Sequence, residues 1–116
     1  MPDQNHSIHS SLREKILEHL FIGEVLNVLW KKNIYDIEVL KADVDSDGYD
    51  VDISCQRTIR HIQLKASYKG SSTSNQKVQL SLCSKPSGCV IWIQFDPNSL
   101  DLGPFYWFGG GPGLPP

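Results

Sequence analysis

A change in the spacing of apolar residues near position 34 constrains the fold of this 116-residue chain more than any other feature. Before it, apolar residues recur at steps of three and four, as in Leu12, Ile16 and Leu20, which is typical of an amphipathic helix. After it, apolar and polar residues alternate in short runs rich in β-branched side chains, which is typical of strands. One helix followed by several strands predicts a single α/β domain.

The helix is predicted from about Ser10 to Lys32, with Ser11 and Glu14 forming a capping box at its start. Strands are predicted at Tyr35–Lys41, Tyr49–Cys55, Ile59–Ala66, Val78–Leu82, Cys89–Phe95 and Phe105–Phe108. Residues 78–82 alternate like a strand, and a helix there is the alternative. Turn residues occur at 45–48, 85–88 and 96–98, and residues 69–77 form a polar loop. The chain therefore divides into an N-terminal extension (1–9), one domain (10–108) and a flexible Gly/Pro tail (109–116).

Composition limits the classes of function. With 13 acidic and 11 basic residues the net charge is -2. The chain therefore lacks the basic surface of a protein that binds nucleic acid over most of its area, and any contact with nucleic acid is expected to be local. No apolar run approaches the roughly 18 to 20 residues of a membrane span, and the first residues do not resemble a signal peptide, so we expect a cytoplasmic protein without membrane contact. Three cysteines without a CxxC pair indicate neither a disulfide framework nor a zinc site.

Two predicted strands carry polar residues on one face, Asp50 and Asp52 on the first and His61, Gln63 and Lys65 on the second. As an antiparallel hairpin they have two registers that match their apolar faces. A two-residue turn sets Asp50 opposite Gln63 and Asp52 opposite His61, whereas a four-residue loop sets Asp50 opposite Lys65 and Asp52 opposite Gln63. The longer loop is at least as favourable, because glutamine and arginine are not the residues that a tight turn prefers. Either register brings a carboxylate, an amide and an ammonium group together.

These three groups suit hydrolysis of a phosphodiester. A carboxylate and a carbonyl oxygen hold a hard cation such as Mg²⁺, which supplies a hydroxide, and a lysine orients that nucleophile and offsets phosphate charge. A sheet with one solvated face also places such residues side by side, and this alternative needs no chemistry.

The same residues carry a resemblance to a known family. Asp50, followed after twelve intervening residues by Gln63-Leu64-Lys65, is similar to the PD-(D/E)XK, or restriction-endonuclease-like, nucleases in the Gln-x-Lys variant of Mrr-like and related small bacterial proteins. The resemblance covers roughly residues 11 to 67. It implies a restriction-endonuclease-like core in which a long N-terminal helix packs on a mixed, largely antiparallel β-sheet.

The resemblance also implies roles. Asp50, the Gln63 side-chain oxygen and the Leu64 backbone carbonyl would bind Mg²⁺ or Mn²⁺, Lys65 would orient the attacking water, and Glu24 would support the site from the helix. Glu24 interrupts the apolar stripe of the predicted helix. Within that stripe its carboxylate would be desolvated and would need a partner, whereas at the margin of the stripe it would be solvated. The chain departs from the family in three ways: Tyr49 replaces the proline before the aspartate, Asp52 adds a carboxylate, and no crossover helix is apparent after the lysine strand.

The expected function is metal-dependent cleavage of DNA by an endonuclease-like phosphodiesterase, and the alternative is a non-catalytic module that binds nucleic acid or protein on the same fold. Lys69 and Lys77 border the polar loop, where they would contact phosphates or simply be solvated. Alternation along a strand would turn only two of the four aromatic residues at 105–108 toward the core. A homodimer that covers the other two is therefore expected, and a monomer with this segment packed on itself is the alternative.

Overall fold

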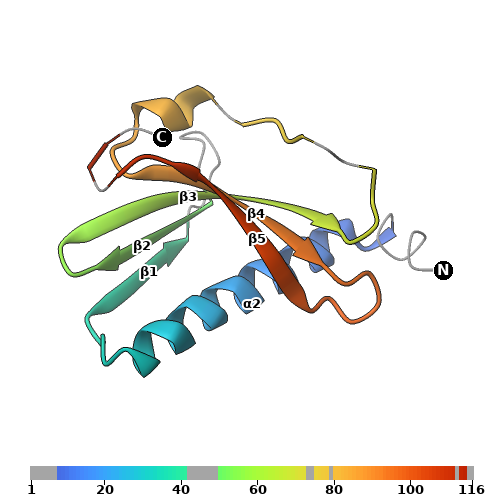
Figure 1. Ribbon diagram of the computed structural model, residues 1–116, viewed down its shortest axis with the longest axis horizontal. Coiled ribbons are helices and arrows are strands. Elements are labelled where there is room, and N and C mark those ends of the chain that lie inside the picture. The colour runs from blue at the N-terminus through green and yellow to red at the C-terminus, as the bar shows by residue number, and fades with distance from the viewer. Residues whose placement is uncertain (1–7, 42–49, 73–74, 79, 112, 115–116) are drawn as a thin grey trace.

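The computed structural model describes residues 8–41, 50–72, 75–78, 80–111 and 113–114, which form a helix and a five-stranded sheet (Figure 1). The elements are α2 (Ser10–Lys31), β1 (Ile37–Lys41), β2 (Val51–Cys55), β3 (Thr58–Tyr68), the 3-10 helix η2 (Leu80–Ser84), β4 (Gly88–Phe95) and β5 (Leu102–Gly109). The turn predicted at 45–48 and most of the N-terminal extension lie outside these residues.

The strands lie in the order β1-β2-β3-β4-β5, so each neighbours the next along the chain. Only β3 and β4 are parallel; the other three neighbouring pairs are antiparallel. A parallel pair needs a crossover connection, and the chain makes it between 69 and 87. In Figure 1, α2 runs below the sheet and η2 lies above it. The prediction of an α/β domain with a mixed, largely antiparallel sheet is therefore confirmed.

Helix α2 begins one residue before the predicted cap. His9 is the N-cap and makes no side-chain hydrogen bond, so the capping box of Ser11 and Glu14 is wrong. At the other end, the Lys32 N–H donates to carbonyls of the last turn, and Asn33 has a left-handed backbone (φ 62°) that stops the helix. In the part of the chain that is described, no helix combines the length and the apolar character that crossing a bilayer requires.

Burial of apolar side chains joins the helix to the sheet. Phe21 is 5% exposed and belongs to one core cluster with buried residues of three strands: Val51, Ile53, Ile62, Cys89 and Ile93. Its ring also lies 6.3 Å from that of Phe105 on β5. Each such side chain contributes about 1.5–3 kcal/mol by leaving water. Packing on the sheet, rather than a capping side chain, thus fixes where the helix lies.

The strand predicted at 78–82 is wrong, because its described residues from Leu80 onward belong to η2. Apolar residues alternate along this sequence, at Val78, Leu80 and Leu82, but the burial of the two leucines does not follow that pattern. Leu82 is fully buried, while Leu80 is 85% exposed. In a 3-10 helix residues three apart share a face, so two residues two apart point to different sides.

The last strand and the tail also differ from expectation. Phe105, Tyr106, Trp107 and Phe108 are 41%, 53%, 56% and 59% exposed, so alternation buries none of the four. The reason is that β5 is an edge strand with a single neighbour. The described part of the tail, predicted to be frayed, makes several contacts. Gly109 pairs with Cys89, and the Gly110 carbonyl accepts a hydrogen bond from Arg60 Nη1 at 3.1 Å. The Leu114 carbonyl accepts the Ser87 N–H at 2.8 Å, and Gly113 N–H donates to the Ser87 hydroxyl.

Candidate active site

The hairpin of β2 and β3 adopts the shorter of the two predicted registers. Gln56 and Arg57 form a two-residue turn, which pairs Val51 with Ile62 and sets Asp52 opposite His61. Both turn residues have positive φ, 51° and 70°, although neither is glycine. A tight turn of this kind matches the right-handed twist of the two strands, and this geometric fit outweighs the residues' weak preference for it.

The second carboxylate of β2 is paired with a histidine. Asp52 Oδ1 lies 2.6 Å from His61 Nδ1, and the two side chains are 16% and 19% exposed. Neither residue lines a described cavity. Asp52 therefore has a structural partner on the hairpin.

The first carboxylate, Asp50, is fixed at the edge of β3. Its N–H donates to the Ile62 carbonyl at 2.7 Å, and its Oδ2 accepts the Leu64 N–H at 2.7 Å. In the described residues the pairing of β2 with β3 starts at Val51 and Ile62, so beyond this point the edge of β3 faces the Asp50 side chain instead of a strand. The carboxylate thereby sits beside the Gln-x-Lys sequence.

A cavity of about 410 Å³ opens at this edge, between the first half of α2, β3 and the crossover segment. Its lining residues are Arg13, Glu14, Leu17, Glu18, Asp50, Gln63, Leu64, Lys65, Ala66, Gln76 and Ile93. The structure therefore brings together four residues that the sequence singles out, Asp50, Gln63, Leu64 and Lys65.

The two polar members of β3 differ in exposure. Gln63 is only 3% exposed, whereas Lys65 is partly exposed. The Lys65 ammonium group forms no ion pair or hydrogen bond with any other residue that the structure describes. The cavity thus contains a buried amide and a lysine whose charge is not neutralised by a described carboxylate.

The helix contributes different acids from the one predicted. Glu24 is exposed and does not line the cavity, whereas Glu14 and Glu18 do. Glu18 and Glu24 are six residues apart, which places them on different faces of a helix of 3.6 residues per turn. The sequence does contain a signal for these two acids. Glu14 and Glu18 are one helical turn apart and lie on either side of Leu17, the first buried residue of α2.

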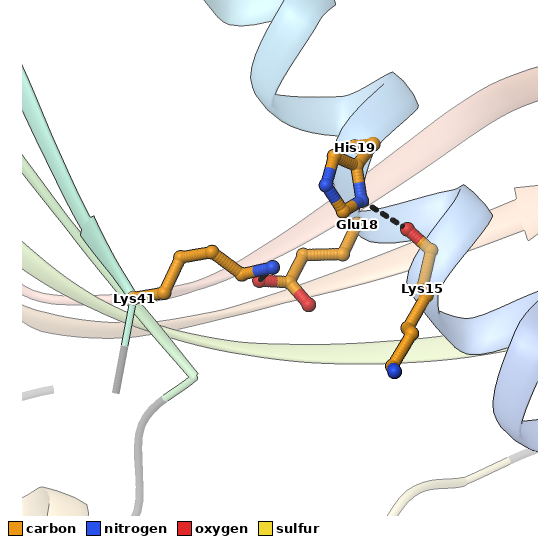
Figure 2. Close-up of polar contacts among 4 residues, drawn as sticks. All are labelled: Lys15, Glu18, His19 and Lys41. Carbon is orange, nitrogen blue, oxygen red and sulfur yellow. Dashed lines mark hydrogen bonds and ion pairs between the residues drawn. The ribbon is translucent and has the colours of Figure 1, made fainter. Parts of the chain in front are cut away.

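Glu18 also connects the helix to the sheet. Its Oε1 lies 3.5 Å from the Nζ atom of Lys41, the last residue of β1 (Figure 2). Figure 2 also shows that His19 turns to the Lys15 carbonyl of its own helix. The ion pair directs the Glu18 carboxylate toward the end of β1.

The predicted phosphate contacts lie outside the cavity. Lys69 and Lys77 are both exposed and line neither described cavity, although Gln76, next to Lys77, lines the larger one. Among the described residues no group of three or more His, Cys, Asp and Glu side chains could hold a metal ion. Any cation site here therefore depends on amide and backbone oxygens as well as on carboxylates.

No protein-family model, curated protein or solved structure gives a significant match to this chain.

Proposed function

We propose that this chain is a metal-dependent phosphodiesterase that cleaves DNA as an endonuclease, with its centre at Asp50, Gln63 and Lys65. The observation that carries the proposal is the 2.7 Å hydrogen bond from Leu64 N–H to Asp50 Oδ2, in a cavity lined also by Gln63 and Lys65. A carboxylate, an amide oxygen and an ammonium group around one space of about 410 Å³ match the needs of phosphodiester hydrolysis.

The order of the elements supports a restriction-endonuclease-like core. A helix precedes the sheet, Asp50 precedes β2, Gln63 and Lys65 lie on β3, and the chain then crosses to a strand parallel to β3. The crossover carries the five-residue η2 where the resemblance implies a longer helix. The cavity is lined by residues of α2, β3 and β4 together with Asp50 and Gln76 and by no residue of η2, so this difference does not alter its proposed groups.

The donor set fits a hard divalent cation. The oxygen ligands that we propose are those of the Asp50 carboxylate, the Gln63 side chain and the Leu64 carbonyl, which points to the same strand edge as the Leu64 N–H. Mg²⁺ and Mn²⁺ prefer oxygen ligands, and Mg²⁺ is usually held by one or two carboxylates with water completing its shell. When bound, the ion supplies a nucleophilic hydroxide at neutral pH and offsets phosphate charge.

The protein groups then have separate roles. In hydrolysis a water oxygen bonds to phosphorus, one phosphorus–oxygen ester bond breaks, and the departing oxygen takes up a proton. The Lys65 ammonium orients the water by donating hydrogen bonds and stabilises the charge on the phosphate oxygens. Glu14 and Glu18 support the site from α2 in the place given to Glu24 by the resemblance.

One observation favours the non-catalytic alternative, a module that binds nucleic acid or protein. Glu18 is paired with Lys41, and the described residues hold no three-member group of His, Cys, Asp and Glu for a metal. A single carboxylate with an amide gives a weaker cation site than two carboxylates.

The deciding experiment is cleavage of supercoiled plasmid and single-stranded DNA with Mg²⁺ or Mn²⁺, using the full chain, EDTA and Lys65→Ala as controls. If the chain is a nuclease, the wild type should produce nicked or shortened DNA, and these products should be absent with EDTA and with Lys65→Ala. A folded wild-type protein that cleaves neither substrate with either metal would leave the binding module as the function.

For the exposed aromatic strand we propose a second copy of the chain as partner. Residues 105–108 are all more than 40% exposed on the edge strand β5, so they present apolar area and unpaired backbone groups together. A twofold dimer would cover both and place two sites on one DNA. Sedimentation should show a dimer that Trp107→Glu dissociates; a monomer at all concentrations would refute it.

A further inference from the structure

A second cavity, of about 210 Å³, lies beside the first, toward the end of β3. Arg13 of α2 and Ala66 of β3 line both cavities. The remaining lining residues are Ser67, Tyr68, Ser71, Ser72 and Phe95. None of them is acidic, whereas Glu14, Glu18 and Asp50 line the first cavity. The second cavity therefore combines one positive charge with several hydroxyl groups.

Ser67 has a hydrogen to donate and no lone pair left. Its side-chain oxygen accepts a hydrogen bond from Trp92 Nε1 at 2.9 Å and another from Gln94 Nε2 at 3.3 Å. A hydroxyl has two acceptor lone pairs and one hydrogen, so these two bonds occupy its acceptor capacity. Ser67 is 7% exposed, and no described residue accepts its hydrogen. Its hydrogen can therefore be donated to an acceptor that enters the cavity.

The backbone of β3 adds a second donor. The Leu64 N–H points to the β2 side of the strand, where it meets Asp50. Because alternate residues of a strand direct their N–H groups to the same edge, the Ala66 N–H points there as well. Over the part of β2 that is described, pairing reaches no further along β3 than Ile62, so this N–H faces the shared border of the two cavities.

Arg13 is positioned by packing. Its guanidinium carbon lies 5.6 Å from the centre of the Phe95 ring, and its Nε is buried without a hydrogen-bond partner among the described residues. It forms no ion pair with a described carboxylate, although Glu14 and Glu18 line the same cavity. A rigidly held guanidinium whose charge is not neutralised is well suited to bind a phosphate oxygen.

We propose that the second cavity is a phosphate-binding subsite, in which Arg13, the Ala66 N–H and the Ser67 hydroxyl donate to one tetrahedral oxyanion. The proposal rests on the proposed function for its ligand: the oxyanion is the backbone phosphate of a DNA strand next to the phosphate that lies at Lys65. Because the two cavities share Arg13 and Ala66, a strand lying along β3 would place successive phosphates in them.

The test measures binding without cleavage. Fluorescence anisotropy of a labelled single-stranded oligonucleotide is recorded with the full chain in EDTA, for wild type, Arg13→Gln, Arg13→Lys and Lys32→Gln. Lys32→Gln is the matched control, since it removes one exposed positive charge at the far end of the same helix. We expect Arg13→Gln to weaken binding about tenfold and lower the salt slope by about one, Arg13→Lys to retain most affinity, and Lys32→Gln to stay within about twofold. Inorganic phosphate should compete with the oligonucleotide.

The outcomes separate this subsite from the nuclease. Binding that depends on Arg13 in a protein that cleaves no DNA supports the subsite and refutes only the enzyme. Equal binding by Arg13→Gln and Lys32→Gln overturns the subsite even where wild type cleaves DNA, and so does a wild type that binds neither the oligonucleotide nor inorganic phosphate. Phosphate binding that depends on Arg13 without oligonucleotide binding overturns the DNA ligand and leaves a site for a small oxyanion. Unchanged thermal unfolding of Arg13→Gln excludes misfolding as the cause.

Discussion

Asp50 and Leu64 are joined by a hydrogen bond of 2.7 Å between a carboxylate oxygen and a strand N–H, at the point where the described pairing of β2 with β3 ends. The bond replaces the ladder contact that a further strand residue would have made. It also holds the carboxylate beside Gln63 and Lys65. The same interaction thus ends a strand pair and orients the group on which the proposed chemistry depends.

Removing the acceptor should destabilise the fold. Asp50→Ala leaves the Leu64 N–H without its partner, so we expect the free energy of unfolding to fall by about 1–3 kcal/mol. Asp50→Asn keeps an acceptor oxygen and should cost clearly less, although it should abolish metal binding. Urea denaturation measures both, with the exposed Asp36→Ala as control. Equal losses for the two variants, or none, would contradict the role of this hydrogen bond.

Lys65→Ala should separate activity from stability. Lys65 has no described ion-pair partner, so its removal should shift the Tm by no more than about 2 °C. Cleavage should fall by about 10²-fold or more, because the charge on the phosphate loses its stabilising donor. The exposed Lys77→Ala controls for a general loss of positive charge. Full activity in Lys65→Ala would remove the lysine from the mechanism.

Gln63→Glu should make the thermal stability of the protein depend on Mg²⁺. Position 63 is 3% exposed, so a new carboxylate there is costly to bury, and we expect the Tm in EDTA to drop by about 5 °C or more. The second carboxylate should also strengthen cation binding, so Mg²⁺ should raise the Tm of the variant more than that of wild type. Thermal unfolding with and without Mg²⁺ measures this, with the exposed Gln56→Glu as control. A Gln63→Glu variant that Mg²⁺ does not stabilise would argue against a cation at this position.

Asp96 should make the fold sensitive to acid. The N–H groups of Ser99 and Asn98 donate to its Oδ1 at 2.9 and 2.8 Å, and these bonds lower the pKa of the carboxyl. A lowered pKa stabilises the folded state above the unfolded value of about 3.9, and this stabilisation is lost as the pH falls through the folded pKa.

Asp96→Asn should therefore be less stable than wild type near neutral pH, with a gap that closes as the pH drops below about 4. Urea unfolding across this range measures the gap. Asp101→Asn, at the end of the same loop, is the control, because no described N–H group donates to the Asp101 carboxylate. A pH-independent gap for Asp96→Asn would show that the two hydrogen bonds do not stabilise the ionised form.

The periodicity of the sequence predicts most of the fold. The helix and five of the six expected strands are present, because apolar residues three and four apart mark the helix and short runs of β-branched and aromatic residues mark the strands. The expected strand at 78–82 failed because three alternating apolar residues, Val78, Leu80 and Leu82, are too short a pattern to separate a strand from a helical turn. The capping box failed because packing of Phe21 fixes the helix and does not require a capping side chain.

The candidate site was predictable where it depends on strand geometry. Asp50, Gln63 and Lys65 are near each other because a hairpin places them so in either register. The helix acid was not predictable in the same way, because the rotation of α2 about its axis depends on which apolar residues reach the sheet. Leu17 and Phe21 do, and this brings Glu14 and Glu18 to the cavity and leaves Glu24 exposed. Arg13 and Ser67 carry no signal in the sequence pattern.

The central claim is that Asp50, Gln63 and Leu64 seat one divalent cation, and anomalous diffraction from a crystal of the full chain soaked in Mn²⁺ tests it most directly. The account predicts a peak about 2.0–2.2 Å from an Asp50 carboxylate oxygen and from the Gln63 side-chain oxygen. An ordered cavity without a peak, or a peak only at other residues, would contradict it.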